Sequence, residues 1–191
     1  MSIPDRLSPR AKLLLMLGLF TLPIAASYLT FYLWPPARSM NYGELLQAGP
    51  LPDVNLPDFA GNVFSMASLR GNWILLQVDA GRCPGTCAQK LYVMRQLRLA
   101  QGKQMQRIER VFLIDDDTLP SESLRREYDG TYCLLAHGSP LLAALPVATK
   151  LRDHIYLIDP LGNLVLRYPA NADPRRMSKD LVRLLQVSQI G

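Results

Sequence analysis

The chain has 191 residues with 21 basic and 16 acidic side chains, which is enough for one compact domain and an appendage but not for two ordinary domains. Its formal net charge of +5 is concentrated at the N-terminus, because residues 1–38 hold four basic side chains and one acidic one. Taking these away from the totals leaves 17 basic and 15 acidic side chains, and this nearly neutral remainder excludes nucleic acid as the expected partner.

A long apolar run follows the N-terminal basic residues. No charged residue lies between Lys12 and Arg38, and the run exceeds the roughly 20 residues that a membrane helix needs, so we predict a single-pass transmembrane anchor over 13–34. A cleaved signal peptide is the alternative, but the apolar run continues beyond its small-residue site. Because Arg6, Arg10 and Lys12 precede the run, the positive-inside rule predicts a cytoplasmic N-terminus. The folded domain would then lie in the bacterial periplasm, or in the intermembrane space if the membrane is the mitochondrial inner membrane.

The chain is expected to divide into a cytoplasmic segment (1–12), the anchor, a proline-rich tether (35–55) and a folded domain (56–191). Hydrophobic periodicity and turn signals predict an α/β domain. Its expected elements are a hairpin after Pro57, a strand over Trp73–Val78, a helix over Thr86–Gln101, a strand over Arg110–Ile114, a helix over Ser121–Tyr128, a strand over Thr131–Leu135, a short helix within Ser139–Thr149, a hairpin of Ile155–Ile158 and Leu164–Tyr168, and a last helix from Asp173-Pro174 to about Val187.

Two cysteines stand where a buried strand passes into a helix. Cys83 and Cys87 flank a Pro-Gly-Thr turn, and this spacing puts both thiols near a helix N-terminus. There, unpaired backbone N–H groups and the helix dipole favour the thiolate, which is the nucleophile and the metal ligand. A structural disulfide or buried apolar thiols would be the alternative. An exposed turn is a poor way to fill a core, so we interpret the two cysteines as a redox-active pair.

The other candidate residues have simpler interpretations. Cys133 is the odd third cysteine and lies in an apolar strand, where a buried inert thiol is expected. Met94 and Met105 have helical spacing and are expected in the core rather than as copper ligands. The three carboxylates of 115–117 are interpreted as solvated charges at a strand end, and His137 as a loop histidine.

The order strand, cysteine turn, helix, strand, helix, hairpin, helix is that of the thioredoxin fold, a central mixed sheet flanked by helices. Redox members of that fold carry a cis-proline before the hairpin, whereas this chain has Asp153-His154 there. With Cys83-Pro-Gly-Thr-Cys87 and the phrase Asp-His-Ile-Tyr-Leu-Ile-Asp-Pro-Leu-Gly, the chain resembles the Sco/SenC family of copper chaperones. These are membrane-anchored thioredoxin-fold proteins with a C-P-x-x-C motif and an Asp-His pair. The resemblance covers about Leu56–Val187.

The resemblance implies a metallochaperone more than an enzyme. It implies that Cys83, Cys87 and His154 bind copper and that Asp153 orients the histidine. Two thiolates and one imidazole favour Cu(I), with Cu(II) as a second option. The implied activity is copper delivery to the binuclear copper centre of cytochrome c oxidase subunit II, or reduction of the cysteines at that centre. Another periplasmic copper protein is the alternative recipient.

Two departures from the family pattern concern the partner surface. In the first, Asp115-Asp-Asp-Thr replaces the usual Asp-Pro-x-x-Asp-Thr phrase, and the segment that leads to the Asp-His pair is shorter than in the family. In the second, Gly85-Thr86 replaces the acidic residue that often follows the motif proline. Two other functions therefore stand beside the metallochaperone. One is a periplasmic thiol-disulfide oxidoreductase of the thioredoxin superfamily. The other is a scaffold that only docks a membrane partner.

Overall fold

The structure is a computed structural model that describes residues 8–33, 41–147 and 150–188. It forms two separate units, divided between Met40 and Asn41. The first contains one helix, α1 (Pro9–Leu33), whose 25 residues include an apolar window of mean hydropathy 1.9 with no side chain buried. By length and composition this helix can cross a membrane. It begins four residues before the predicted anchor, and residue 34 lies outside the described residues.

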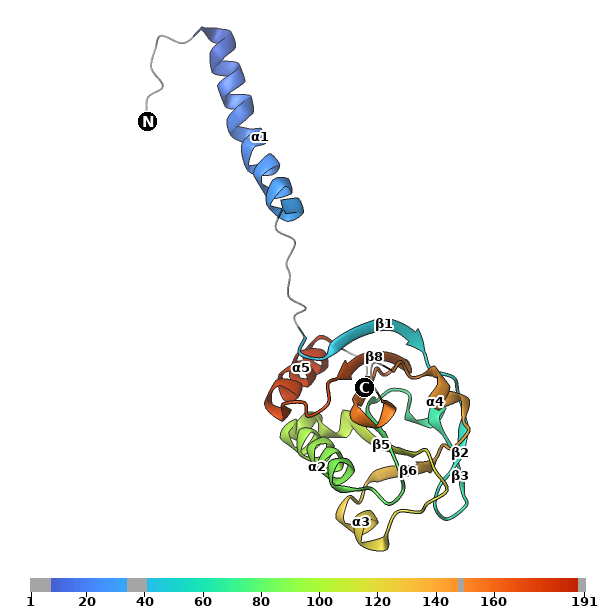
Figure 1. Cartoon of the computed structure of the whole chain (residues 1–191). Helices are drawn as coiled ribbons and strands as arrows, with labels where there is room; N and C mark the ends of the chain where they lie inside the picture. Colours follow the sequence, from blue (N-terminus) through green and yellow to red (C-terminus); the bar gives the residue numbers. More distant parts are fainter. Residues whose placement is uncertain (1–7, 34–40, 148–149, 189–191) are drawn as a thin grey trace. The chain divides into compact units, whose positions relative to one another are not determined.

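The second unit is built on a six-stranded mixed sheet of order β1-β8-β7-β4-β5-β6 (Figure 1). Strands β4, β5 and β6 run parallel, whereas β7, β8 and β1 pair with their neighbours in antiparallel fashion. A separate hairpin is formed by β2 and β3. The strands are β1 (Glu44–Pro50), β2 (Asn55–Pro57), β3 (Val63–Ser65), β4 (Trp73–Asp79), β5 (Ile108–Ile114), β6 (Thr131–Leu135), β7 (Ile155–Ile158) and β8 (Asn163–Tyr168).

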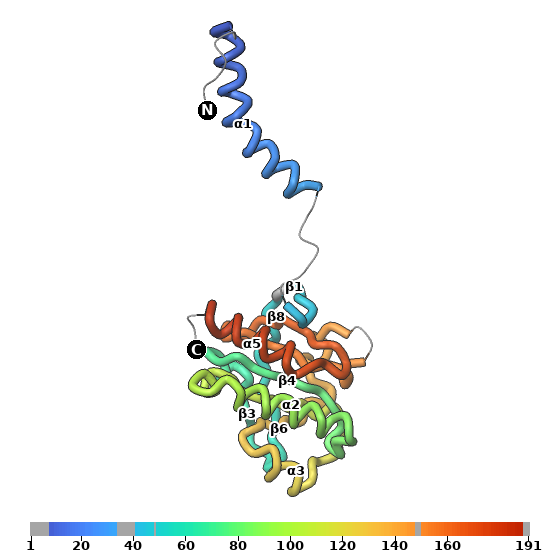
Figure 2. The backbone as a smooth tube through the Cα atoms, turned by 90° about the vertical axis from the view of Figure 1, so that its left-hand side faces the viewer, coloured from blue at the N-terminus to red at the C-terminus, as the bar shows by residue number. Residues whose placement is uncertain are grey.

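The helices cover the two faces of the sheet unequally. The two long helices, α2 (Gly85–Ala100) and α5 (Pro174–Val187), contact each other and lie on one face (Figure 2). The short helix α4 (Pro140–Ala144) and the β2–β3 hairpin cover the other face, while α3 (Glu122–Glu127) connects β5 to β6. Three 3-10 turns complete the unit: η1 (Met66–Leu69), η2 (Gly102–Arg107) and η3 (Leu151–Asp153).

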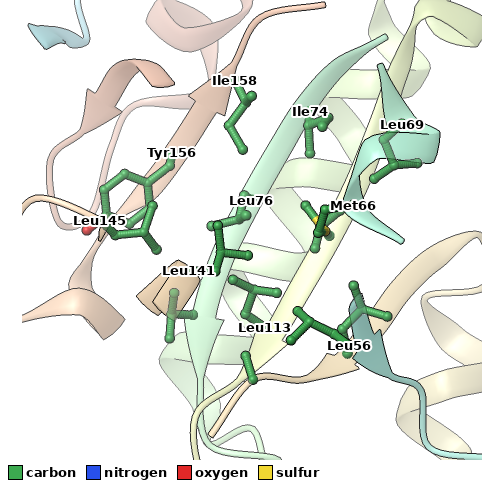
Figure 3. Close-up of a cluster of buried hydrophobic side chains, with 14 of the residues drawn as sticks. Leu56, Met66, Leu69, Ile74, Leu76, Leu113, Leu141, Leu145, Tyr156 and Ile158 are labelled. Atoms are coloured by element: carbon green, nitrogen blue, oxygen red, sulfur yellow. The ribbon is translucent and has the colours of Figure 1, made fainter. Parts of the chain in front are cut away.

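Two apolar layers, one on each face of the sheet, form most of the core. Side chains alternate between the faces along each strand. Leu75 and Ile155 therefore join the cluster beneath α2 and α5, whereas Leu76 and Tyr156 join the cluster beneath α4 and the hairpin (Figure 3). All seven residues of β4 are buried, which explains why its sequence is an almost continuous apolar run rather than an alternating one.

The predicted central mixed sheet flanked by helices, with an N-terminal apolar helix, is present in the structure. One segment differs. The predicted tether contains β1, which pairs with β8 at the edge of the sheet, and the second unit begins at Asn41 rather than near Leu56. Edge strands tolerate proline and irregularity, and β1 has a bulge between Leu45 and Gly49 and ends at Pro50. Because of these features, the sequence pattern did not predict the strand.

A buried carboxylate fastens the start of this unit to its last helix. Asp180 of α5 is 2% exposed and accepts hydrogen bonds from the backbone N–H groups of Tyr42, at 2.9 and 3.0 Å, and Gly43, at 2.9 Å. The bonds join residues far apart in the chain at the entrance to β1. The carboxylate therefore holds the edge strand in place from outside the sheet.

We expect Asp180→Ala to lower the free energy of unfolding by about 2–3 kcal/mol, because it leaves buried N–H groups unpaired and removes hydrogen bonds to a charged acceptor. Urea unfolding of the full chain in detergent would measure the change. Asp53→Ala is the matched control. It removes an ion pair with Arg70 in which both side chains are more than half exposed, so it should cost less than about 1 kcal/mol. Equal losses in the two variants would contradict this role of Asp180.

Candidate functional site

The turn between β4 and α2 holds the two cysteines together. Cys83 and Cys87 form a disulfide with their Cα atoms 5.0 Å apart, and their side chains are 7% and 0% exposed. Cys83 has φ +46°, a left-handed conformation that is uncommon for a residue other than glycine. Helix α2 begins at Gly85, so Cys87 lies in its first turn, where the Cys87 N–H donates to the Pro84 carbonyl oxygen at 2.8 Å. The predicted pair at a helix N-terminus is therefore present.

The loop after β5 is hydrogen-bonded to this turn through Asp116 and Thr118. Asp116 Oδ1 accepts hydrogen bonds from Gly81 N (3.0 Å) and Thr118 Oγ1 (2.7 Å), and Thr118 Oγ1 accepts from Arg82 N (3.2 Å). Burial acts to raise the pKa of Asp116, but the hydrogen bonds from Gly81 and Thr118 hold it below its usual value. The approach is so close that a Cβ on Gly81 would lie 1.7 Å from the Thr118 carbonyl oxygen.

The three carboxylates after β5 are thus not merely solvated charges, which corrects the interpretation made from the sequence. Asp115 binds Arg152 through two hydrogen bonds of 2.8 and 2.7 Å, and Asp117 lies 2.9 Å from Nδ1 of His137. His137 is an exposed loop residue, and its hydrogen bond with Asp117 raises its pKa. Each carboxylate therefore ties the loop to a different segment.

A buried glutamine lies beneath the disulfide. Gln77 of β4 is fully buried, and its Nε2 donates to Cys87 Sγ at 3.5 Å. Sulfur is a weak acceptor as a disulfide and a stronger one as a thiolate. The amide therefore stabilises the reduced, deprotonated form of Cys87 more than the oxidised form. The Gln77 amide does not titrate near neutral pH, so it cannot accept the proton that leaves Cys87, and another group must do so.

The charged pair closest to the turn in sequence is also buried. Lys90 Nζ lies 3.1 Å from Asp79 Oδ2, with side chains that are 13% and 5% exposed. Burial lowers the pKa of Lys90, and the charge of Asp79 partly opposes that effect. Lys90 also donates to the backbone carbonyls of Val78, at 3.3 Å, and of Arg152. One cation therefore joins α2 to the end of β4 and to η3, the turn that precedes His154.

His154 lies at the start of β7 and is 5% exposed. Its Nδ1 is 2.9 Å from the Tyr168 carbonyl oxygen, which can only accept, so Nδ1 is the donor in this contact. Its neighbour Ile155 pairs with Gln77, and alternation puts Ile155 on the α2 face and His154 on the other. The imidazole accordingly lies near Tyr156, with ring centroids 6.0 Å apart.

The structure therefore brings Cys83 and Cys87 together and directs the ring of His154 toward the opposite layer of the sheet. Within residues 8–33, 41–147 and 150–188, no three or more His, Cys, Asp or Glu side chains are grouped so that they could hold a metal ion. The two sulfurs form a disulfide here; after reduction, two adjacent thiolates would suit Cu(I). Coordination by His154 stays a prediction.

Asp153 faces the other way, into a cleft of about 490 Å³ beside α2. The cleft runs from the first turns of α2 to the loop between β8 and α5, and Lys90 and Arg152 contribute its cationic groups. The remaining lining residues are Gly85, Thr86, Gln89, Val93, Ile155, Pro169, Ala170, Asn171, Ala172 and Pro174. The cleft thus begins at the residues between the two cysteines and gives a partner access to that helix end.

Sequence reasoning missed Gln77 and Lys90. A signal for Gln77 was present, because one amide interrupts the apolar run of Trp73–Val78, and a polar residue inside a buried strand needs a partner. Lys90 gave no such signal, because lysines are common on the solvent-facing side of an amphipathic helix. Met94 is fully buried, in agreement with a core role. Cys133 is a half-buried free thiol on β6.

A sequence-family model described as "Transmembrane-like, thioredoxin-like, C-terminal domain" matches residues 73–188. A comparison with curated proteins gives no match. Among solved structures, copper-bound Sco1 from yeast is 19% identical, with 73% of this chain and 94% of that chain covered and a TM-score of 0.60. Apo Sco1 from Thermus thermophilus is 18% identical, covering 78% and 99%, with a TM-score of 0.59. A putative protein disulfide isomerase from Bacteroides thetaiotaomicron is 21% identical, covering 77% and 95%, with a TM-score of 0.55.

The fold and the paired cysteines define a thioredoxin-fold protein. The chain belongs to the family of transmembrane-like, thioredoxin-like C-terminal domains, since the match spans more than half of its length. The predicted resemblance to Sco proteins is confirmed at the level of the fold, which the chain shares with a putative disulfide isomerase as well.

We expect Gly81→Ala to destabilise the folded chain by about 1–3 kcal/mol, because the new methyl group would overlap the Thr118 backbone and force the cysteine turn to move. Gly85→Ala is the matched control on the same turn, since a Cβ there meets nothing within 4 Å. Thermal unfolding of both oxidised variants would measure the difference. If the Gly81 variant were as stable as the Gly85 variant, the contact between Gly81 and the Thr118 backbone would not constrain the turn.

Cys133 is expected to react slowly with iodoacetamide. Burial raises the pKa of its thiol to about 11, so at about pH 8 only about one thiol in a thousand is ionised, and the thiolate is the nucleophile. The labelling rate of the oxidised chain, followed by mass spectrometry, should rise about tenfold per pH unit up to about pH 11. Cys133→Ala is the control for labelling elsewhere. Rapid labelling near neutral pH would contradict the buried environment.

Proposed function

We propose that the chain is a membrane-anchored protein whose Cys83–Cys87 pair cycles between disulfide and dithiol, and whose dithiol form binds Cu(I). One observation carries the proposal: the two sulfurs meet at the N-terminus of α2 with the Gln77 amide directed at Cys87. Helix N–H groups, the dipole and the amide all favour thiolate over thiol. Thiolates serve both as redox nucleophiles and as Cu(I) ligands.

The redox half-cycle needs a partner dithiol. A partner thiolate attacks one sulfur of the Cys83–Cys87 disulfide and forms a mixed disulfide, which the second partner thiol then resolves. Two electrons and two protons pass to this chain, and the partner becomes the disulfide. The cleft that begins at Gly85 and Thr86 is where the partner backbone would lie.

Copper enters as cargo after reduction. Cu(I) binding displaces the thiol protons, so affinity rises with pH until both thiols are ionised. His154 is proposed as the third ligand through Nε2, since Nδ1 is directed at the Tyr168 carbonyl. That coordination requires the imidazole to leave the Tyr156 side of the sheet. We propose that η3 moves to allow this. Two contacts hold η3 in place: Lys90 of α2 donates to the Arg152 carbonyl oxygen, and the Arg152 side chain binds Asp115. After the movement, Asp153 would orient the histidine.

The proposed location follows from α1. With a cytoplasmic N-terminus and a single membrane crossing, the domain lies in the periplasm of a bacterium, or in the intermembrane space of a mitochondrion. The proposed recipient is subunit II of cytochrome c oxidase, to which the chain would deliver copper or whose copper-site cysteines it would reduce. Another periplasmic copper protein is the alternative recipient.

A thiol-disulfide oxidoreductase without copper is the second candidate. The direction of the His154 ring favours it, because the ring faces the layer opposite to Cys87. The spacing of three residues between the cysteines and the presence of Asp153-His154 where redox members of the fold carry a proline favour the copper-binding function. The two functions make different predictions for one measurement.

We expect the reduced full chain in detergent to bind Cu(I) tightly in chelator competition, and His154→Ala to weaken that affinity at least about tenfold, which is about 1.4 kcal/mol. His137→Ala is the matched control, since the chain has two histidines and His137 is an exposed loop residue. It should leave the affinity unchanged. Cys83→Ser and Cys87→Ser should each abolish tight binding.

The outcomes separate the candidates. Tight binding with equal affinity in wild type and His154→Ala would remove His154 from the site but keep the copper function. Weak binding in all variants, together with a reversible Cys83–Cys87 disulfide at physiological potentials, would assign the chain to the oxidoreductases. Weak binding without a reversible disulfide would overturn the proposed function as a whole.

A further inference from the structure

A buried arginine lies on the α2 face of the sheet, away from the cysteines. Arg110 is the third residue of β5 and is 4% exposed. It pairs with Leu75 of β4, a core residue beneath α2, so its side chain leaves the sheet on that same face. A guanidinium in such a position has lost most of its hydration, and burial of a charge is costly unless it is paired.

The hydrogen bonds of Arg110 are incomplete. Nη2 donates to the Asp129 carbonyl oxygen at 2.7 Å, but the buried Nε and Nη1 atoms have no hydrogen-bond partner in the described part of the chain. Burial lowers the pKa of Arg110, and the charges of Arg98 and Arg95 add to that effect. The charges of Glu109 and Asp129 act in the opposite direction, but neither carboxylate accepts a hydrogen bond from the buried Nε and Nη1 atoms.

Arg110 lines a pocket of about 260 Å³. Arg95, Arg98 and Leu99 of α2 line one side, Arg126 and Glu127 of α3 another, and Asp129 precedes β6. Arg126 is already paired with Glu122, outside the pocket. Gly130, with φ +74°, lets the chain pass close to the guanidinium, since a Cβ there would lie 3.2 Å from Arg110 Nη2. Arginines from three elements thus surround one small space.

We propose that this pocket binds a phosphate-type oxyanion, with Arg110 as its central ligand and Arg95 and Arg98 beside it. Guanidinium groups are well suited to phosphate oxygens. Arg95 and Arg98 come from α2 and Arg110 from β5, so the guanidinium groups approach from different directions, which matches the four oxygens of a tetrahedral anion better than the two oxygens of a planar carboxylate. The anion would supply the missing acceptors, and its charge would offset the repulsion among Arg95, Arg98 and Arg110. The group could belong to free phosphate or to the headgroup of a phospholipid.

The test is calorimetric titration of the oxidised full chain, in a detergent without phosphate groups, with inorganic phosphate. We expect saturable binding that competes with sulfate but not with chloride. Arg110→Gln should weaken it at least tenfold. Arg95→Gln changes an exposed residue that should not impair folding, and it should weaken binding several-fold. Arg175→Gln is the matched control, because Arg175 is an exposed residue of α5 outside the pocket, and it should leave binding unchanged.

A second readout separates a ligand site from a merely structural arginine. Phosphate should raise the unfolding temperature of the wild-type chain and have no such effect on Arg110→Gln. Absence of saturable phosphate binding to the wild-type chain would overturn the proposal, as would equal affinity in wild type and Arg95→Gln. Cys83→Ser should bind phosphate normally, so failure of this site and failure of the copper function are distinguishable.

Reconstitution then identifies the source of the phosphate group. The same titration is made in nanodiscs of phosphatidylcholine alone and in nanodiscs that also contain phosphatidylglycerol. If an anionic headgroup occupies the pocket, phosphatidylglycerol should weaken the apparent phosphate affinity of the wild-type chain. If the ligand is free phosphate, the affinity should be the same in both nanodiscs. Either result supports an oxyanion pocket and assigns its ligand.

Discussion

The burial of β4 on both faces is the constraint on which the site depends. Every residue of this strand is buried, yet it carries Gln77 and Asp79, polar side chains that face α2. A buried polar group needs a partner, and α2 supplies one for each: the sulfur of Cys87 for the glutamine and the ammonium of Lys90 for the aspartate. The Gln77 Oε1 atom has no hydrogen-bond partner in the described part of the chain, but the two contacts fix the helix that carries the redox pair.

These contacts extend outward from β4 to segments that are distant in the chain. Lys90 also reaches η3, Arg152 of η3 reaches Asp115, and the neighbouring Asp116 clasps the cysteine turn. The turn, the loop after β5 and the segment before His154 therefore form one connected set of hydrogen bonds and ion pairs. A change at the sulfurs can reach the histidine segment through α2 and through this loop, which gives the proposed ligand exchange a physical route.

The sequence predicted the local features well. Periodicity located β4, α2 and the last hairpin, and the Pro-Gly turn placed the cysteines at a helix start, because those patterns arise from residues that are neighbours in the chain. It did not reveal β1, whose pairing partner is more than a hundred residues away and which ends at Pro50 in a proline-rich segment. It also read Asp115–Asp117 as solvated charges, since their partners come from other segments.

The sequence by itself determined a helix long enough to cross a membrane, the order of strands and helices after β1, and a cysteine pair at the first turn of α2. Each follows from composition and short-range spacing. Only the tertiary structure decided that the His154 ring faces the layer opposite to Cys87, that Gln77 contacts the sulfur, and that Arg110 is buried with donors to spare. These depend on strand register and on the pleat, which assign each side chain to one face of the sheet and bring together residues that no local pattern connects.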